Sequence, residues 1–248
     1  MITLKNKNIL VTRAAPDAKR FAEKIIRYGG KPLVTPLLQI NCLPVDKKVV
    51  MDTYEWVFFA SQNGVDCFIK QNPYIGELNS RKIAAVGPKT ADKIRHYGYQ
   101  VDFMPSTYNA EVMANEFLTK YLESGPVLLV RGVLSSTVLP DTFEQHNQTY
   151  HCLEVYETVA NPGAKDNLQA YLVQNDIDYL TFTSPSTIDA FLQLVDHIDS
   201  YRDIPAVCIG TTTERKAREK GFIHTIVPDQ FTTDSMLERI SEHIQRGK

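Results

Sequence analysis

The chain has 248 residues, of which 43% are hydrophobic and 23% charged, a composition typical of a globular protein of one or two domains. Its formal net charge is −2 and its charges form no basic run, which argues against nucleic acid and anionic membranes as partners. No apolar stretch approaches the roughly 18 residues that cross a bilayer, and the N-terminal MITLKNKNILVTR lacks the apolar block of a signal peptide. We therefore expect a cytoplasmic protein.

Short apolar runs of strand length alternate with amphipathic segments of helix length along the whole chain. This alternation is typical of α/β proteins with parallel sheets, and no low-complexity linker interrupts it. The strands are expected near 9–12, 33–34, 56–59, 83–86, 101–103, 127–130, 151–155, 179–182, 206–209 and 225–227.

Much of the chain repeats itself at a constant offset of 123 positions. The matching pairs are Phe59 with Phe182, Ser61 with Ser184, Phe68 with Phe191, Gly87 with Gly210, Thr90 with Thr213, Lys93 with Lys216, Gly98 with Gly221, Pro105 with Pro228 and Met113 with Met236. A duplication of one ancestral half explains this register and predicts two similar lobes. A cleft between such lobes is a preferred place for a ligand.

Several expected strand-to-helix junctions carry small or hydroxyl residues. Ser61 and Ser184 each follow an apolar strand, Gly87 and Gly210 open two further helices, and Thr211 has a glutamate three positions on, as in a capping box. In parallel sheets these junctions present helix N–H groups and a partial positive charge, which attract anions. The residues are therefore either helix caps alone or parts of an anion-binding site, and the sequence leaves both interpretations open.

Arg13 and Arg131 form another repeated pair, at an offset of 118, and each directly follows an apolar strand. Both side chains could face the cleft. A structural arginine held in a salt bridge is an equally good interpretation of each.

The common catalytic motifs are missing. AVGPKT resembles the end of a phosphate-binding loop but lacks the upstream glycine, and no GxGxxG, GxSxG or HExxH occurs. The six histidines show no metal-ligand spacing. We therefore expect no nucleotide hydrolysis, no serine hydrolysis, no metal and no cofactor.

The four cysteines, Cys42, Cys67, Cys152 and Cys208, lie mostly in apolar contexts without CxxC spacing. This distribution favours reduced thiols in a core over a disulfide framework or a zinc site.

Both halves contain segments that resemble uroporphyrinogen-III synthases. In the first half they are ILVTRAAPDAKRFAEKIIRYGGKPLVTPLLQI, FFASQNGVDCF, AAVGPKTADKIRHYGYQV and YNAEVMANEF, and in the second CLEVYETVANPG, DYLTFTSPSTIDAF and AVCIGTTTERKAREKGF. Each segment alone is a weak signal. Their combination runs almost from end to end in the right order and is specific.

The resemblance implies two similar doubly wound, flavodoxin-like parallel-sheet lobes joined by a two-stranded connection, with a cleft between them. Residues 1–36 and 158–248 would form one lobe and 42–152 the other, with crossing strands at 37–41 and 153–157. Each lobe then receives five of the ten expected strands.

The resemblance also implies a reaction. Hydroxymethylbilane, a linear tetrapyrrole, is closed to uroporphyrinogen III with loss of water and inversion of ring D, without a cofactor. Tyr156 matches the tyrosine proposed in the family to give a proton to the departing hydroxide. A phenol is protonated at neutral pH and is a mild acid, so we expect help rather than indispensability. The alternative is a packing role for Tyr156 in a crossing strand.

The substrate carries eight carboxylates, and a slightly acidic protein must hold them locally, with N–H donors, hydroxyls and a few cations. The bilane-producing enzyme is an expected transient partner. A rival hypothesis is a non-catalytic two-lobed module that closes on a small anion. The residues expected to bind substrate are Arg13, Ser61, Asn63, Gly87, Lys89, Thr90, Ser106, Asn109, Arg131, Ser184, Ser186, Thr211 and Thr212.

Overall fold

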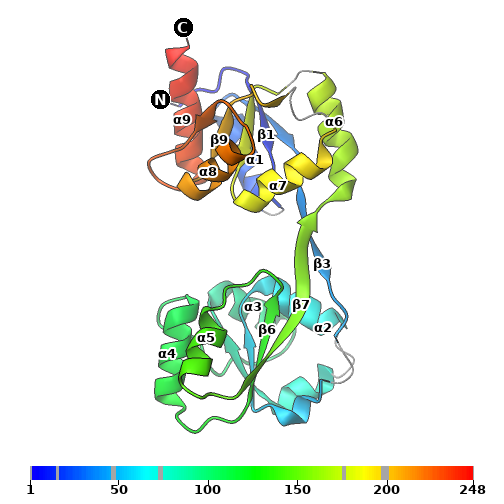
Figure 1. Ribbon diagram of the computed structural model, residues 1–248, viewed down its shortest axis with the longest axis vertical. Coiled ribbons are helices and arrows are strands. Elements are labelled where there is room, and N and C mark those ends of the chain that lie inside the picture. The colour runs from blue at the N-terminus through cyan, green and yellow to red at the C-terminus, as the bar shows by residue number, and fades with distance from the viewer. Residues whose placement is uncertain are drawn as a thin grey trace. The chain divides into compact units, whose positions relative to one another are not determined.

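The computed structural model describes residues 2–14, 17–45, 49–71, 75–174, 177–196 and 201–247. Contacts divide the chain into two compact units: unit 1, made of Met1–Gln39 and Val159–Lys248, and unit 2, made of Ile40–Thr158. Each unit contains one five-stranded sheet covered by helices (Figure 1). The expected α/β class with parallel sheets is therefore confirmed.

The sheet of unit 1 is parallel, with the strand order β10-β9-β8-β1-β2. Its strands are β1 (Asn8–Val11), β2 (Lys31–Val34), β8 (Tyr179–Phe182), β9 (Ala206–Cys208) and β10 (Thr225–Ile226). Read from the other edge, the chain order is 2-1-3-4-5, the flavodoxin-like arrangement, in which the order reverses between β1 and β8.

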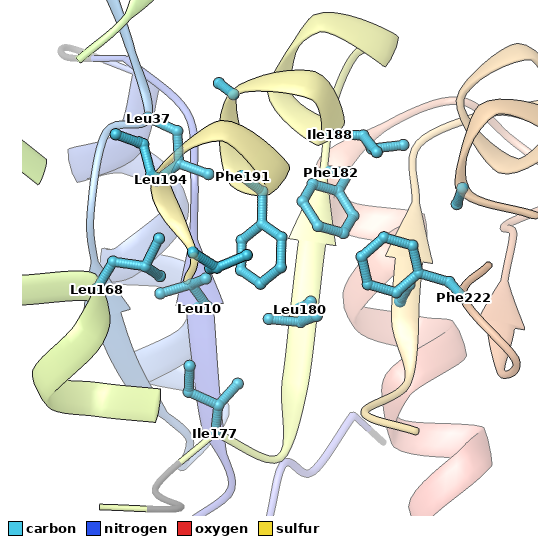
Figure 2. Close-up of a cluster of buried hydrophobic side chains, with 14 of the residues drawn as sticks. Leu10, Leu37, Leu168, Ile177, Leu180, Phe182, Ile188, Phe191, Leu194 and Phe222 are labelled. Atoms are coloured by element: carbon cyan, nitrogen blue, oxygen red, sulfur yellow. The ribbon is translucent and has the colours of Figure 1, made fainter. Parts of the chain in front are cut away.

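Helices cover both faces of this sheet because its strands are apolar on both sides. Leu10 and Leu180 pack beneath α6 (Lys165–Val173), α7 (Pro185–Leu194) and α8 (Thr211–Glu219), in the cluster drawn in Figure 2. Neighbouring residues in the strands point to the opposite face, where α1 (Asp17–Arg27) and α9 (Thr233–Arg246) cover them. The short η3 (Pro162–Ala164) leads into α6.

The sheet of unit 2 has the order β3-β7-β6-β4-β5. Its strands are β3 (Leu38–Cys42), β4 (Trp56–Phe59), β5 (Lys82–Ala85), β6 (Val127–Gly132) and β7 (Tyr150–Ala160). The pairings β4–β5, β4–β6 and β6–β7 are parallel. The chain passes between the units within β3 and within β7.

The helices of unit 2 also lie on both faces of the sheet. Val57, Phe59 and Val130 contact the helices α2 (Gln62–Gln71) and α3 (Pro88–His96). The alternate strand residues contact α4 (Ala110–Lys120) and α5 (Val138–Gln145). The short η1 (Met51–Thr53) and η2 (Ile75–Ser80) complete the described elements of this unit.

The strand expected at 101–103 is wrong. Only an isolated bridge between Phe103 and Ala84 forms at the β5 edge. The carboxylate of Asp102 accepts the Ile83 N–H at 2.8 Å, while the Asp102 and Phe103 N–H groups both donate to the Ile83 carbonyl oxygen. The Asp102 carboxylate therefore occupies the Ile83 N–H, which in a regular ladder would donate to a backbone carbonyl oxygen.

The sequence repeat is also a repeat of contacts. Lys93 lies 3.1 Å from Asp66 across α2 and α3, and Lys216 lies 3.0 Å from Asp189 across α7 and α8. Ring centroids are 5.5 Å apart in the pair Phe59–Phe68 and 5.6 Å apart in its match Phe182–Phe191. Gly98 and Gly221, just past α3 and α8, have φ of 87° and 89°, a left-handed conformation that favours glycine.

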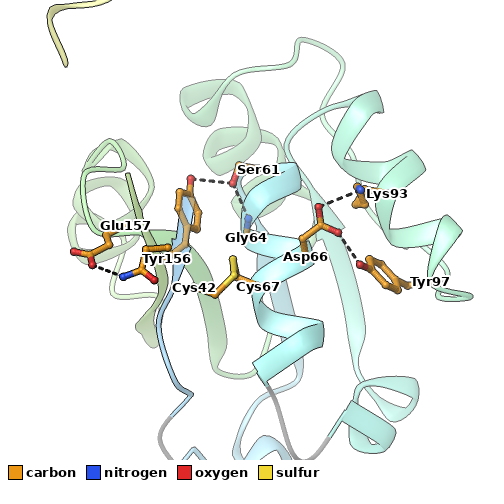
Figure 3. Close-up of a disulfide and its surroundings, with 10 residues drawn as sticks. Cys42, Ser61, Gly64, Asp66, Cys67, Lys93, Tyr97, Tyr156 and Glu157 are labelled. Carbon is orange, nitrogen blue, oxygen red and sulfur yellow. Dashed lines mark hydrogen bonds and ion pairs between the residues drawn. A yellow bond between two sulfur atoms is a disulfide. The ribbon is translucent and has the colours of Figure 1, made fainter. Parts of the chain in front are cut away.

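The expectation of four reduced cysteines is wrong. Cys42 and Cys67 form a disulfide (Figure 3), because the end of β3 lies against α2 although 25 positions separate the two residues. No motif spacing reveals this pairing. Cys152 is free and exposed, whereas Cys208 is free and buried, and burial raises the pKa of its thiol to about 12.

Candidate active site

A pocket of about 230 Å³ opens in unit 2 at the carboxyl ends of β4 and β6. The strand order of the unit reverses between these two strands, and ligands of open α/β sheets bind at such points. The volume is below the roughly 300–1,000 Å³ of pockets that hold drug-sized ligands. The lining residues are the apolar Phe58, Ala60, Val86, Ala110, Leu129, Val130, Leu139 and Pro140 with the polar Ser61, Arg131, Ser135, Ser136 and Tyr156.

Tyr156 lies on β7, and its hydroxyl is 3.0 Å from Ser61 Oγ (Figure 3). Ser61 precedes α2, and its Oγ accepts a hydrogen bond from the Gly64 N–H at 3.0 Å. Ser61 is therefore a helix cap and a partner of Tyr156 at the same time. The two interpretations that the sequence left open for Ser61 do not exclude each other.

Arg131 lies near the end of β6 and is half-buried. Its guanidinium donates to the backbone carbonyl oxygen of Ser135 and lies 4.0 Å from Cys152 Sγ. Within the described residues no carboxylate forms an ion pair with it. A cation that is fixed by neutral partners remains available to an anion.

A tight turn follows Arg131 and holds the rim of the pocket. The Ser135 N–H donates to the Gly132 carbonyl oxygen at 3.0 Å, and the Gly132 N–H donates to Ser135 Oγ at 2.9 Å. The Val133 N–H donates to the carbonyl oxygen of Tyr156 at 3.0 Å. The turn is thus tied directly to the strand that carries the tyrosine.

Most other expected site residues of unit 2 lie at helix N-termini, outside the pocket lining. Gly87 is the N-cap of α3, Thr90 is buried in that helix, and Lys89 is exposed, with its carbonyl oxygen accepting from the Gln62 side chain. Asn63 is exposed in the first turn of α2. Asn109 uses its side chain to cap α4, accepting from Val112 N–H at 2.9 Å.

Ser106 lies away from the pocket that contains Tyr156. It lines a separate, more open hollow together with Asp102, Glu116 and Lys120. Its N–H and hydroxyl both donate to the Glu116 carboxylate, and these hydrogen bonds lower the pKa of Glu116. The donors of Ser106 are thus already bound to a carboxylate of the chain itself.

The remaining expected residues belong to unit 1. Arg13 forms an ion pair with Asp17 at 3.0 Å, which is the structural interpretation of that arginine. Ser184 caps α7 in a capping box and contacts Ser186 Oγ at 2.9 Å. Thr211 and Thr212 are exposed in the first turn of α8.

Sequence reasoning missed Ser135, Ser136 and Gly132. Ser136 Oγ accepts from Val138 N–H at 3.3 Å, at the start of α5. The signal was present, because these residues follow an apolar strand and precede a helix as Ser61 does. The repeat does not reveal Ser135 and Gly132, since the residues that match them at the offset of 118 are Asp17 and Ala14.

In the described part of the chain no group of three or more histidine, cysteine, aspartate or glutamate side chains could hold a metal ion. None of the helices described there is long and apolar enough to cross a membrane.

A family model for uroporphyrinogen-III synthase HemD matches residues 19–238. The chain belongs to the uroporphyrinogen-III synthase family. The family, the enzyme class and the link to porphyrin biosynthesis, which the sequence motifs indicated, are thereby confirmed.

Curated relatives agree with this assignment. The chain is 26% identical to the uroporphyrinogen-III synthase of Chlorobaculum parvum over 96% of its own length and 100% of that protein. It is also 26% identical to the porphyrin biosynthesis protein HemD of Ruminiclostridium josui, but spans only 48% of that longer protein.

Solved structures share the fold. The uroporphyrinogen-III synthetase of Helicobacter pylori superposes with a TM-score of 0.64 at 20% identity, covering 94% of this chain and 97% of that one. A mutant uroporphyrinogen III synthase of the extremely thermophilic bacterium Thermus thermophilus gives a TM-score of 0.54 at 15% identity, covering 97% and 99%.

Proposed function

We propose that this enzyme closes hydroxymethylbilane to uroporphyrinogen III, with loss of water and inversion of ring D, and that the pocket of unit 2 takes part in the chemistry. The observation that supports this assignment is the hydrogen bond between the hydroxyls of Tyr156 and Ser61 in a pocket that also contains Arg131. A proton donor, an oriented hydroxyl and a cation without a carboxylate partner in the described residues are together what a polyanionic substrate with a hydroxyl leaving group requires.

In the proposed mechanism Tyr156 supplies the proton that turns the departing hydroxide into water. The bond between carbon and oxygen breaks with its electron pair on oxygen, pushed by the electron-rich pyrrole, and leaves a cation on the bilane. Ser61 Oγ already accepts from Gly64 N–H, so its own proton is free to point at the Tyr156 oxygen and stabilise the phenolate that develops. Ring closure then releases a proton from ring D, which restores the phenol.

Selectivity in this proposal comes from steering, because hydroxymethylbilane also cyclises spontaneously to the uninverted isomer. A 100-fold preference for one route needs only about 2.7 kcal/mol of differential transition-state stabilisation. A few oriented hydrogen bonds supply that amount. Strong acids, strong bases and metals are not required, and we expect activity without added cofactor.

We further propose that carboxylates of the substrate are shared among many donors, and that two flavodoxin-like lobes close a cleft over the substrate. In support, the two units are connected within β3 and β7, and domains that few segments join usually move relative to each other. We also propose that the protein is cytoplasmic and that it transiently contacts the enzyme that produces the bilane. The proposed donors are Arg13, Ser61, Asn63, Gly87, Lys89, Thr90, Ser106, Asn109, Arg131, Ser184, Ser186, Thr211 and Thr212.

The deciding experiment supplies freshly generated hydroxymethylbilane to the purified protein, oxidises the products and separates the type I and type III isomers. We expect type III, and Tyr156→Phe should lower turnover about tenfold to a thousandfold, since general acid catalysis contributes up to about 10²–10⁴. Tyr150→Phe is the matched control, because Tyr150 lies at the start of the same strand and outside the pocket lining.

Two outcomes would contradict the proposal. Type I product alone would remove the assigned activity and favour the non-catalytic binding module. Undiminished turnover of Tyr156→Phe under single-turnover conditions would leave Tyr156 with a packing role.

A further inference from the structure

Gly132, at the end of β6, faces the ring of Tyr156 without any space for a side chain. A Cβ atom built on Gly132 would lie 2.5 Å from Tyr156 Cζ, 2.6 Å from Cε2 and 2.9 Å from the hydroxyl oxygen. Non-bonded carbon atoms prefer separations of about 3.5–4.0 Å. Any other residue at position 132 would therefore displace the ring by roughly 1 Å or more.

The backbone conformation of Gly132 does not by itself require glycine. The glycines with a left-handed φ in the described residues are Gly29, Gly98 and Gly221, and Gly132 is not among them. An alanine could adopt the Gly132 conformation without strain. The close approach of the tyrosine ring is thus the reason that this position has no side chain.

An irregularity in the sheet creates this approach. In the pairing of β6 with β7, Arg131 is opposite Glu154, but the next residue, Gly132, is opposite Tyr156. Val155 is skipped, as in a β-bulge, and bulges next to active sites commonly re-aim a side chain. Here the skipped residue places Tyr156 directly over the glycine.

The backbone on the glycine side cannot easily retreat from an added methyl group. Gly132 is fixed through its N–H and its carbonyl oxygen to Ser135, and the following N–H, of Val133, is bonded to the Tyr156 carbonyl oxygen. The half-buried tyrosine side chain can rotate about its own bonds and is therefore the partner that would move. Its movement would break the 3.0 Å contact between its hydroxyl and Ser61 Oγ.

We propose that Gly132 is a positioning residue for Tyr156: its missing side chain lets the tyrosine ring lie against the β6 backbone, so that the hydroxyl reaches Ser61 and the pocket. The consequence for catalysis depends on the acid role proposed above for Tyr156. The consequence for the position of the ring does not.

The test compares Gly132→Ala with Gly76→Ala, a control in the same unit whose added Cβ would meet nothing within 4 Å. We expect Gly132→Ala to lower kcat to within about threefold of the Tyr156→Phe value, with a smaller change in KM. The double variant Gly132→Ala/Tyr156→Phe should be no slower than Tyr156→Phe alone, because both changes remove the same hydroxyl from its place. The control should behave as the unmodified enzyme.

A second readout is independent of activity. In protein labelled with ¹³C-tyrosine, the signal missing from the spectrum of Tyr156→Phe belongs to Tyr156. It should shift in Gly132→Ala and stay in place in Gly76→Ala. A shifted signal together with a fully active Tyr156→Phe would support the positioning role and refute the acid role. An unmoved signal with wild-type kcat in Gly132→Ala would overturn the positioning role.

If Gly132→Ala folds poorly, the double variant Gly132→Ala/Tyr156→Ala still decides. Without the ring the added methyl group has space, so this double variant should unfold at the same temperature as Tyr156→Ala or higher. A drop in unfolding temperature relative to Tyr156→Ala would show that the methyl group clashes with something other than the ring, which contradicts the proposal.

Discussion

The two units place the same strand-end arginine in different chemical settings. In unit 1 the Arg13 guanidinium donates to the Asp17 carboxylate, four residues on. In unit 2 the Arg131 guanidinium donates to the residue four positions on as well, but that residue is Ser135 and the acceptor is its neutral backbone carbonyl. The same spacing of four residues thus neutralises one arginine and leaves the other charge uncompensated by the described carboxylates.

The strand-end serines differ in the same way. The hydroxyl of Ser184 forms only local hydrogen bonds among the described residues, to the first turn of α7 and to Ser186. Ser61 also caps its helix but has a further partner, Tyr156, from a strand nearly a hundred residues away in the chain. The hydroxyl of Ser184 thus stays within its own turn, whereas the hydroxyl of Ser61 reaches across the strand-order reversal of unit 2.

Features farther from that reversal are alike in the two units. Gly87 and Gly210 begin α3 and α8, and a Cβ on either would touch an exposed aromatic side chain, Tyr108 in one case and Phe231 in the other. The aromatic residues are themselves a repeated pair at the offset of 123. The two units therefore share this frame, and the residues proposed for the chemistry, Ser61 and Arg131, lie where their contacts differ from those of Ser184 and Arg13.

Removing the disulfide should give the largest change in stability, and the change should be confined to unit 2. Closing a loop of 25 residues is worth about 3.5 kcal/mol in the chain-entropy model, and native disulfides typically contribute 2–4 kcal/mol. The positions that match Cys42 and Cys67 in unit 1 are Lys165 and Ala190, so unit 1 has no equivalent bond. We expect Cys42→Ser/Cys67→Ser to unfold in two calorimetric steps, with only one step lowered.

Thiol titration in denaturant provides the control for that experiment. The unreduced chain should expose two thiols and the reduced chain four, since Cys152 and Cys208 are free. Four thiols before any reduction, or a stability unchanged by the double substitution, would contradict the prediction.

Substituting Arg131 in unit 2 should raise KM more than substituting Arg13 in unit 1. We expect Arg131→Met to raise KM about tenfold. In free energy this change is near the lower end of the roughly 1.5–3 kcal/mol that a hydrogen bond to a charged group contributes, because other donors also bind the substrate carboxylates. Arg13→Met, its matched control, should raise KM only about twofold, because Asp17 already binds that guanidinium. Initial rates over a range of bilane concentrations measure both. Equal effects of the two substitutions on KM would mean that the ion pair with Asp17 does not keep the Arg13 guanidinium from binding the substrate.

Exchanging the partners of the two arginines tests whether a carboxylate four positions on lowers the affinity for substrate. Ser135→Asp puts a carboxylate where unit 1 has one and should raise KM about threefold to fivefold, as expected for a partly exposed ion pair worth at most about 1 kcal/mol. Asp17→Ser should leave KM unchanged or lower it slightly. A salt titration is the control, since the effect of Ser135→Asp should shrink as ionic strength rises.

The sequence predicted the sheet architecture well because the decisive signals are local. Apolar runs and caps locate β4, β6 and β8, and the repeated lysines Lys93 and Lys216 both form ion pairs between neighbouring helices. The strand expected at 101–103 failed because the Asp102 carboxylate accepts the Ile83 N–H in place of a ladder carbonyl oxygen, which no apolar pattern reveals.

The candidate site was only partly predictable. Ser61, Arg131 and Tyr156 were expected, and the structure brings them to one pocket. Gly132 was missed because its close approach to Tyr156 comes from one skipped residue in the pairing with β7. The bond between Cys42 and Cys67 likewise depends on the packing of β3 against α2, which is a tertiary property.

The smallest predicted effect concerns the ion pairs between neighbouring helices. Burial raises the pKa of Asp66, but hydrogen bonds from Tyr97 and Lys93 lower it more, so the net pKa is below its ordinary value. The same bond from Tyr97 raises the pKa of that phenol. Because the carboxyl pKa is lower in the folded state, Asp66 stabilises the fold at pH values above its unfolded-state pKa, near 3.8. This stabilisation is lost as the pH falls through the folded-state pKa. The raised phenol pKa stabilises the fold below about 10 and stops doing so as pH rises through the folded value.

Asp66→Asn should therefore destabilise the protein by about 1 kcal/mol at neutral pH, and by progressively less as the pH falls below 3.8. Asp189→Asn is the matched control in unit 1. Its partner Lys216 is kept, but a lysine, Lys220, stands where unit 2 has Tyr97, and Asp189 is more exposed than Asp66, 52% against 25%. Calorimetric unfolding between pH 2.5 and 8 should show a larger, pH-dependent loss for Asp66→Asn. A loss that is equal in the two variants, or that does not change with pH, would mean that the tyrosine adds nothing to the ion pair.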